Sequence, residues 1–184
     1  MTYFDKPGKE NTAQTVELAL AAAKDAGIQT IVVASGTGYT ARYFKDAAQA
    51  GMHIVVVTHA NGYRQPGDQE LEPAVRQELE AVGMKVVTTT HVLSGAERGI
   101  STRFGGAYPV EIMAHTLRMF GQGTKVCVEC AVMALDCGAI APGPVLCVAG
   151  TGGGADTAWI LRPAHAQDIL STKLDRLVCK PILP

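Results

Sequence analysis

The sequence predicts an α/β domain of three layers, in which helices cover both faces of a mostly parallel sheet. Short runs of β-branched residues recur along the chain, with glycine-containing turns and stretches of helical apolar spacing between them. Such runs are typical of strands buried on both faces, and their alternation with helices favours parallel strands joined by right-handed crossovers. The length of 184 residues fits one domain over residues 1–184.

The first half of the chain carries the clearest alternation. A helix is expected to begin at Asn11, which forms a capping-box pattern with Gln14, and to end at Gly27. A second helix is expected to end at Gly51, and a third, with apolar residues at helical spacing, to end at Gly83. The predicted strands of this half are residues 28–34, 53–58 and 85–90.

The second half is less regular. Residues 91–108 show no clear periodicity, so we expect a long irregular segment there, which in a compact domain usually has a function. Pro109 suits the first turn of a further helix. The apolar residues 125–128 predict a strand, and residues 130–136 predict a helical segment.

Two later apolar runs, residues 145–149 and 157–161, are separated by too few residues for a crossover helix. They are therefore expected to pair as an antiparallel hairpin. This hairpin would place an antiparallel strand at the C-terminal edge of the mostly parallel sheet, which is a common mixture. A last strand is expected at residues 174–179.

Composition and charge limit the classes of partner. Lysine and arginine total 16 against 17 acidic residues, so no basic excess indicates a nucleic-acid-binding protein. The longest apolar runs fall far short of the roughly 18 residues that a membrane span needs, and the N-terminus lacks the apolar segment of a signal peptide. We therefore expect a cytoplasmic protein with no nucleic-acid or membrane partner.

The five cysteines indicate reduced thiols rather than a disulfide framework in a chain of this size. Cys127 and Cys130 have the spacing of a zinc ligand pair, but a second pair is missing and the segment is apolar. Buried core thiols are the favoured interpretation, and no metal site is predicted.

The strongest candidate for ligand binding is the Ser35 loop (residues 35–40), which follows the first predicted strand. Ligands of open α/β sheets bind beyond the carboxyl ends of the parallel strands, where helices begin and backbone amides are free. Small residues let these amides approach an anion, hydroxyls add donors, and Arg42 follows closely. A phosphate is the expected ligand group; the alternative is an ordinary turn in which Thr40 caps the helix. The candidate residues are Ser35, Gly36, Thr37, Gly38 and Thr40.

The second candidate is residues 150–157, which contain the glycine loop (residues 150–156) that connects the two strands of the predicted hairpin. It matches the G-x-G-x-x-A pattern of dinucleotide-binding proteins, but that pattern requires a helix to follow, whereas residues 158–161 predict a strand. We therefore favour a flexible loop that folds over a ligand, and the alternative is a loop that merely turns. Its candidate residues are Gly152, Gly153 and Gly154.

Candidate polar groups outside the two loops lie near the same predicted edge of the sheet. His59 and His91 come directly after predicted strands, and Glu129 is expected at the end of its own strand, where it would accept a sugar hydroxyl or cap the next segment. Arg103, like Arg98, lies in the irregular segment and is a candidate anion contact. Structural or surface roles are the alternative for each. Because the sequence contains no Walker lysine, G-x-S-x-G or His-Glu-x-x-His motif, no catalytic residue is assigned.

Several segments resemble the C-terminal α/β domain of pyruvate kinase, namely residues 10–13, 31–41, 54–58, 145–157 and 159–162. More closely, nearly the whole chain resembles a family of stand-alone proteins with that fold, through residues 4–8, 91–95, 125–129, 154–158 and 162–165. The Asp-Lys-Pro-Gly segment at residues 5–8 is distinctive, although the sequence gives no physical reason for it. The resemblance implies the fold of the pyruvate kinase C-terminal domain.

In pyruvate kinase this domain does no chemistry and binds an allosteric sugar bisphosphate. The resemblance implies that the Ser35 loop holds one phosphate and that the glycine loop covers the ligand. Residues 91–108 have no counterpart in the kinase domain, and the kinase's catalytic barrel is absent from this sequence. A nucleotide or flavin mononucleotide (FMN) would satisfy the same anion site as a sugar phosphate, with its ring against Tyr39 or Phe104.

The function expected first is a non-catalytic sensor or binding module for a phosphorylated small molecule. The alternative is an enzyme that acts on a phosphorylated metabolite or uses a bound flavin, with His59, His91, Glu129 and Arg103 around the phosphate. A third expectation is a subunit that acts only by association into a homo-oligomer, because exposed edge strands can pair.

Overall fold

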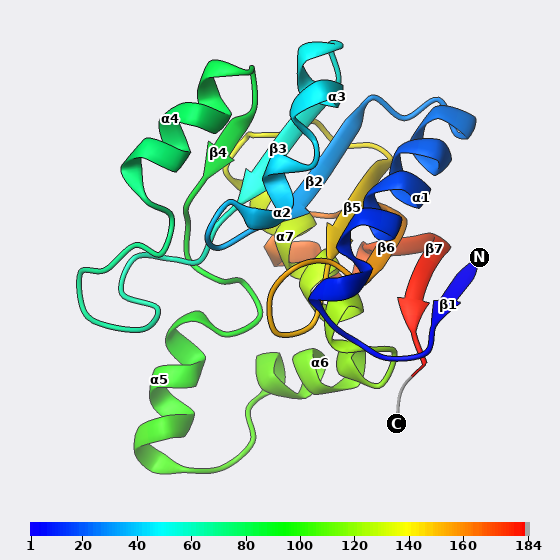
Figure 1. Ribbon diagram of the computed structural model, residues 1–184. Helices are drawn as coiled ribbons and strands as arrows, with labels where there is room; N and C mark the ends of the chain where they lie inside the picture. Colours follow the sequence, from blue (N-terminus) through cyan, green and yellow to red (C-terminus); the bar gives the residue numbers. More distant parts are fainter. Residues whose placement is uncertain (183–184) are drawn as a thin grey trace.

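The computed structural model describes residues 1–182 and contains a seven-stranded sheet with helices on both faces (Figure 1). The three-layer α/β arrangement that the sequence predicts is therefore confirmed. The strands are β1 (Thr2–Phe4), β2 (Thr30–Ala34), β3 (His53–Val57), β4 (Lys85–Val87), β5 (Val145–Ala149), β6 (Thr157–Arg162) and β7 (Lys173–Pro181). The helices are α1 (Thr12–Asp25), α2 (Tyr39–Arg42), α3 (Lys45–Gln49), α4 (Pro73–Ala81), α5 (Gly95–Phe104), α6 (Pro109–Arg118) and α7 (Gln122–Asp136), with 3-10 turns at Lys9–Asn11 and Ala166–Ser171.

The sheet is mixed, with the strand order β1-β7-β6-β5-β2-β3-β4. The pairs β2–β3, β2–β5, β3–β4 and β1–β7 are parallel, whereas β6 runs antiparallel to both β5 and β7. The predicted hairpin of β5 and β6 is confirmed, but β6 is not the edge strand, because β7 and then β1 lie outside it. Thr2 lies opposite Cys179, and pairing over such a distance leaves no local pattern in the sequence.

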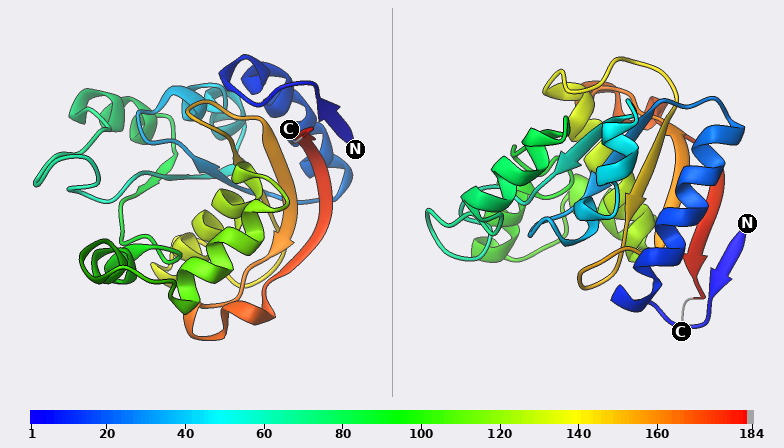
Figure 2. Two further views of the ribbon diagram at one scale, coloured as in Figure 1. Left: turned by 90° about the horizontal axis from the view of Figure 1, so that it is seen from below. Right: turned by 45° about the horizontal axis from the view of Figure 1, so that its top comes forward.

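The two faces of the central strands pack against different helices. Along β2, Ile31 and Val33 belong to the core beneath α1 to α4, whereas Val32 belongs to the core against α7. Residues of a strand point alternately to opposite faces, so a strand covered on both sides is apolar throughout. Figure 2 shows α6 and α7 on one side of the sheet and α1 on the other. The continuous apolar runs of the sequence arise because helices pack on both faces of the central strands.

The predicted strand at residues 125–128 is wrong, because these residues lie inside helix α7. This helix is packed between the sheet and α6, and nearly all of its residues are buried. Gly123 allows the close approach, since a Cβ there would lie 2.2 Å from Oγ1 of Thr157 on β6. A helix that is almost wholly buried has little solvent-exposed polar surface, so its short apolar runs resemble those of a strand.

Residues 91–108 are also more regular than expected, because they contain helix α5. None of its residues is buried, so it carries no apolar stripe that would reveal it in the sequence.

The single helix expected before Gly51 is two short helices, α2 and α3, which meet at the fully buried Phe44. The capping box is absent as well, since the Asn11 side chain donates instead to the carbonyl of Lys6. Within residues 1–182, no helix is long and apolar enough to cross a membrane.

Candidate functional site

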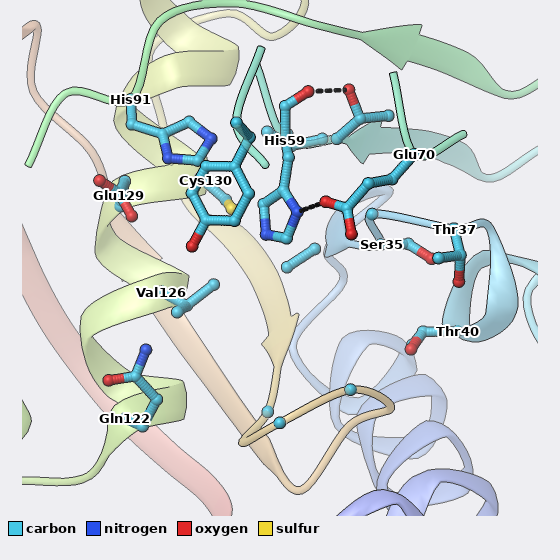
Figure 3. A pocket seen from close by; sticks show the side chains of 18 of the residues that line it. Ser35, Thr37, Thr40, His59, Glu70, His91, Gln122, Val126, Glu129 and Cys130 are labelled. Carbon is cyan, nitrogen blue, oxygen red and sulfur yellow. Dashed lines mark hydrogen bonds and ion pairs between the residues drawn. The ribbon is translucent and has the colours of Figure 1, made fainter. Parts of the chain in front are cut away.

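A cavity of about 450 Å³ lies at the carboxyl ends of β2, β3 and β5, where the sequence predicts a ligand site (Figure 3). Its volume falls in the range of about 300–1,000 Å³ that is usual for small-molecule pockets. The Ser35 loop, the loop after β3, the glycine loop and one side of α7 form its walls. Of the predicted residues, it brings together Ser35, Gly36, Thr37, Thr40, His59, His91, Glu129, Gly152, Gly153 and Gly154.

The Ser35 loop is fixed from inside and open toward the cavity. The Ser35 amide donates to the carbonyl of Val57 at 3.0 Å, and its Oγ accepts the amide of Ala41 at 3.3 Å. The amides of Gly36 and Thr37 have no protein acceptor among the described residues, so they are free to bind an anion. The following helix α2 has only four residues and therefore contributes little helix dipole. The partial positive charge that would attract an anion comes from these two amides.

Gly38 has a structural role and does not line the cavity, in contrast to its expected role. Its φ of 83° lies in the left-handed region, and a Cβ there would be 2.5 Å from Cγ1 of Val75 on α4. Glycine at this position therefore shapes the Ser35 loop. Thr40 lies within α2 instead of capping it, because Gly38 occupies the cap position.

The glycine loop is anchored by the carboxylate of Asp156, a fully buried residue. This carboxylate accepts hydrogen bonds from the amide of Thr151 at 3.2 Å, the amide of Gly8 at 3.1 Å and the hydroxyl of Thr157 at 2.7 Å. The Gly8 bond connects the distinctive Asp-Lys-Pro-Gly segment to the base of the glycine loop. Gly8 itself has a φ of 140°, which favours glycine.

Glycines in this loop serve two different purposes. Gly150 and Gly154 permit close packing, since a Cβ at Gly150 would lie 2.7 Å from the carbonyl oxygen of Gly154. Gly152 and Gly153 have positive φ values of 67° and 105°, but a Cβ on either would meet no heavy atom within 4 Å, so only their backbone conformation requires glycine. In Figure 3 the loop forms the side of the cavity below His59.

His59 is held by a carboxylate that the sequence does not single out. Its Nδ1 contacts Oε2 of Glu70, and the other carboxylate oxygen accepts a hydrogen bond from Nε of Arg64. Burial alone would raise the pKa of Glu70, but the bonds from His59 and Arg64 outweigh burial and lower that pKa. The ring of Tyr63 stacks on His59 with centroids 4.0 Å apart. Figure 3 shows His59 between His91 and Glu70.

His91 lies beside His59, with the two ring centroids 5.6 Å apart. Its Nε2 accepts the amide hydrogen of Ala60 at 3.2 Å, so this nitrogen carries the lone pair and Nδ1 carries the hydrogen of the neutral ring. Burial lowers the pKa of His91, and the nearby Glu129 carboxylate opposes this shift without cancelling it. His91 is therefore a neutral donor at the wall of the cavity.

One side of α7 forms a cavity wall with residues at helical spacing, namely Gln122, Lys125, Val126, Glu129, Cys130 and Met133. Glu129 lies in the middle of this helix, not at the end of a strand. Both of its carboxylate oxygens have partners, because Oε1 accepts the amide of Leu93 at 2.9 Å and Oε2 pairs with the buried Lys125. Binding of a sugar hydroxyl, as expected for Glu129, would therefore compete with these bonds.

Two arginines of the cavity wall have no acidic partner among the described residues. Arg98 comes from α5. Arg118, at the end of α6, donates to the neutral amide oxygen of Gln122 at 2.8 Å. Arg103, the predicted contact, is not at the cavity, because it lies at the outer end of α5 beside the exposed ring of Phe104. A surface-exposed helix gives no sequence signal for which of its arginines faces inward.

The structure also shows where the remaining predicted residues lie relative to the cavity. Arg42 binds Glu78 on α4 at 2.8 Å instead of the cavity, and lowers the pKa of that carboxyl to about 2 together with Lys45. Tyr39 lines the cavity, whereas Phe104 does not. Cys127, Cys130, Cys147 and Cys179 are free and buried, as expected, but Cys137 is exposed. No group of three metal-binding side chains occurs among residues 1–182.

The family model of the pyruvate kinase alpha/beta domain matches residues 13–161 of the chain. The chain belongs to this family. The match includes both loops of the cavity, the parallel strands and the hairpin of β5 and β6. Strands β1 and β7, and the Gly8 anchor of the glycine loop, lie outside the matched residues.

Proposed function

We propose that this protein binds a phosphorylated small molecule in the cavity between the Ser35 loop and the glycine loop. The observation that carries the proposal is the meeting of both loops at one cavity, where the amides of Gly36 and Thr37 are free. Backbone amides in a loop of small residues bind phosphate by direct hydrogen bonds.

Charge around the cavity supports an anionic ligand. Its carboxylates, Glu70 and Glu129, are both paired with cations of the same wall. Arg98 and Arg118 remain without an acidic partner in the part of the chain that the structure describes. The cavity therefore has an excess of positive charge, and an arginine binds phosphate oxygens through well-directed hydrogen bonds.

The chemical class of the ligand follows from the cavity size and its aromatic side chains. A cavity of about 450 Å³ has the size usual for small-molecule sites, which supports a ligand such as a sugar phosphate, a nucleotide or FMN, and Tyr39 and Tyr63 offer surfaces to a ring. A flavin would be visible without any added ligand, since bound FMN absorbs near ~370 and ~450 nm and its ring carries the electronic chemistry. The absorbance spectrum of the purified protein therefore separates FMN from colourless phosphates.

Isothermal titration with three pairs of probes tests the proposal. Ribose 5-phosphate, AMP and FMN are each compared with ribose, adenosine and riboflavin. At least one phosphorylated probe is expected to bind more tightly than its dephosphorylated form. The Ser35→Ala/Thr37→Ala variant is expected to lose about tenfold or more of that affinity, because two hydroxyl donors are removed. The variant Thr116→Ala/Ser171→Ala, altered away from the cavity, serves as the control.

Equal affinity for both members of every pair would contradict the proposal, as would unchanged affinity in the Ser35→Ala/Thr37→Ala variant. Arg118→Gln and Arg98→Gln provide a second test, since each removes a charge that has no acidic partner among the described residues. Each is expected to weaken binding of the phosphorylated probe by roughly tenfold at low salt.

A second candidate function is an enzyme that acts on the bound phosphorylated compound. The sequence favours a non-catalytic module because no oriented base is evident in it. The structure places the Glu70 carboxylate on His59 at the cavity wall, and an imidazole oriented by a carboxylate is a common general base. The contact between His59 and Glu70 therefore supports the enzyme hypothesis, for which the sequence alone offers no oriented base.

A further inference from the structure

We propose that His59 is a general acid–base that moves a proton on a phosphorylated hydroxy-carbonyl compound, with Glu70 as its positioning residue and His91 as a hydrogen-bond donor to the carbonyl oxygen. This inference rests on the proposed function, because the phosphate anchors the substrate. It adds the reaction class, which is proton abstraction from the carbon next to a carbonyl group.

The orientation of His59 is the first argument. Because Nδ1 bonds to the Glu70 carboxylate, Nδ1 carries the hydrogen of the neutral ring and Nε2 carries the lone pair. Figure 3 shows the second nitrogen turned away from Glu70, toward the open space that Val126 borders. Arg64 holds the other oxygen of Glu70, and Tyr63 packs on the ring face, so the imidazole has a defined position.

The distance between His59 and the Ser35 loop is the second argument. A Cβ on Gly36 would lie only 3.1 Å from Nδ1 and 3.3 Å from Cε1 of His59. The loop backbone that would bind the phosphate therefore lies close to the imidazole, with no room for a side chain between them. Cε1 is bonded to Nε2, so a small substrate whose phosphate lies on this loop can extend its next few atoms past Cε1 to Nε2, and proton transfer requires such reach.

His91 supplies the third argument. Its Nδ1 carries the hydrogen, because Nε2 accepts the Ala60 amide, and its burial keeps the ring neutral. A neutral imidazole is a suitable donor to a carbonyl oxygen on which negative charge develops. The cavity thus holds a base and a donor on adjacent walls, with ring centroids 5.6 Å apart.

The proposed step is balanced without any co-reactant. Nε2 of His59 takes the proton of the carbon that bears the hydroxyl, and the electrons of that C–H bond form the carbon–carbon double bond of an enediolate. The carbonyl π electrons move to its oxygen, which accepts the hydrogen bond from His91. The proton on Nε2 returns to the same carbon, or to the neighbouring carbon when the hydroxyl proton of the enediolate passes to the other oxygen. In D2O the proton on Nε2 is replaced by deuterium.

Exchange of carbon-bound hydrogen for deuterium tests the inference. Dihydroxyacetone phosphate and fructose 6-phosphate are incubated with the protein in D2O, and loss of the proton signal next to the carbonyl is followed by NMR. The wild type is expected to exchange at least one probe faster than buffer. His59→Gln is expected to lose roughly 10²–10⁴-fold of that rate, which is the usual contribution of a general base.

Glu70→Gln distinguishes positioning from a structural role. The Gln amide would donate to Nδ1 of His59, which places the ring hydrogen on Nε2 and removes the base. We expect an exchange rate lowered by about tenfold or more, with the dissociation constant for inorganic phosphate unchanged. The control is His115→Gln, since His115 is exposed on α6 away from the cavity. This control is purified identically, so a loss of exchange that occurs in His59→Gln and not in the control excludes a contaminating enzyme as the source.

The outcomes separate this inference from the proposed function. Phosphate binding without exchange of either probe in the wild type would overturn the inference alone. Exchange at the wild-type rate in a folded His59→Gln variant would also overturn it. Failure of inorganic phosphate and of every phosphorylated probe to bind would overturn the proposed function and the inference together. If His59→Gln does not fold, as judged by thermal unfolding, Glu70→Gln carries the test.

Discussion

The fully buried Asp156 accepts a hydrogen bond from the backbone amide of Gly8, which lies 148 positions earlier in the chain. The bond joins the segment after β1 to the base of the glycine loop. Gly154 makes a second contact between the same regions, since a Cβ there would be 2.8 Å from Cα of Lys9. The N-terminal segment is therefore part of the cavity wall's support.

Asp156→Asn is expected to lower the free energy of unfolding by about 1–3 kcal/mol, because a side-chain amide group replaces one oxygen among three donors. The loosened loop should also weaken binding of the phosphorylated probe. Urea unfolding measures the first effect and titration the second. Asp175→Asn is the matched control, since Asp175 forms an exposed pair with Arg162 and its loss should change stability little. Equal effects of the two substitutions would contradict the role assigned to Asp156.

Gly150→Ala is expected to destabilise the protein by about 1–3 kcal/mol, because the new methyl group would collide with the backbone of Gly154 and Ala155. Gly99→Ala is the control, and its expected effect on stability has the opposite sign. Gly99 lies inside α5 with open space around it, so alanine there should stabilise by about 0.5–1 kcal/mol through helix propensity. Thermal and urea unfolding of both variants test this difference in sign, and a stable Gly150→Ala variant would refute the packing argument.

Lys125→Met is expected to cost about 3–5 kcal/mol of unfolding free energy, because it leaves the buried Glu129 charge without its partner. Glu129→Gln on the same background removes that charge and keeps an acceptor for the amide of Leu93. The double variant should therefore recover most of the lost stability. A double-mutant cycle by urea unfolding measures the coupling, and additive effects of the two substitutions would show that the ion pair is unimportant.

Stability is expected to fall as the pH is lowered through the range in which unfolded histidine takes up a proton, about pH 6.5. Burial lowers the pKa of His91 in the folded protein, so between the folded and unfolded values only the unfolded chain binds the proton. Acid therefore favours unfolding, by at most about 1.4 kcal/mol per pH unit for one group. Urea unfolding at pH 7.5 and 5.5 should show a smaller decrease in His91→Gln than in the wild type. An identical decrease in both would refute this origin.

Local patterns predict much of this fold. The β-branched runs of β2 and β3 indicate strands covered on both faces, and the short connection between β5 and β6 indicates a hairpin. Because parallel strands end at one edge, the sequence also predicts that the Ser35 loop, His59 and His91 lie near one another. These inferences succeed because backbone periodicity and chain connectivity are properties of neighbouring residues.

The tertiary structure alone decided the remainder. Nearly all of helix α7 is buried, so its sequence lacks the solvent-exposed polar face by which a helix is recognised, and the apolar run before Glu129 resembles a strand. The contact of Glu70 with His59 depends on the path of the polar loop after β3, which no periodicity describes. The choice between Arg98 and Arg103 depends on which side of α5 faces the cavity. Side-chain partners from different elements are set by packing in three dimensions, and that information is not local in the chain.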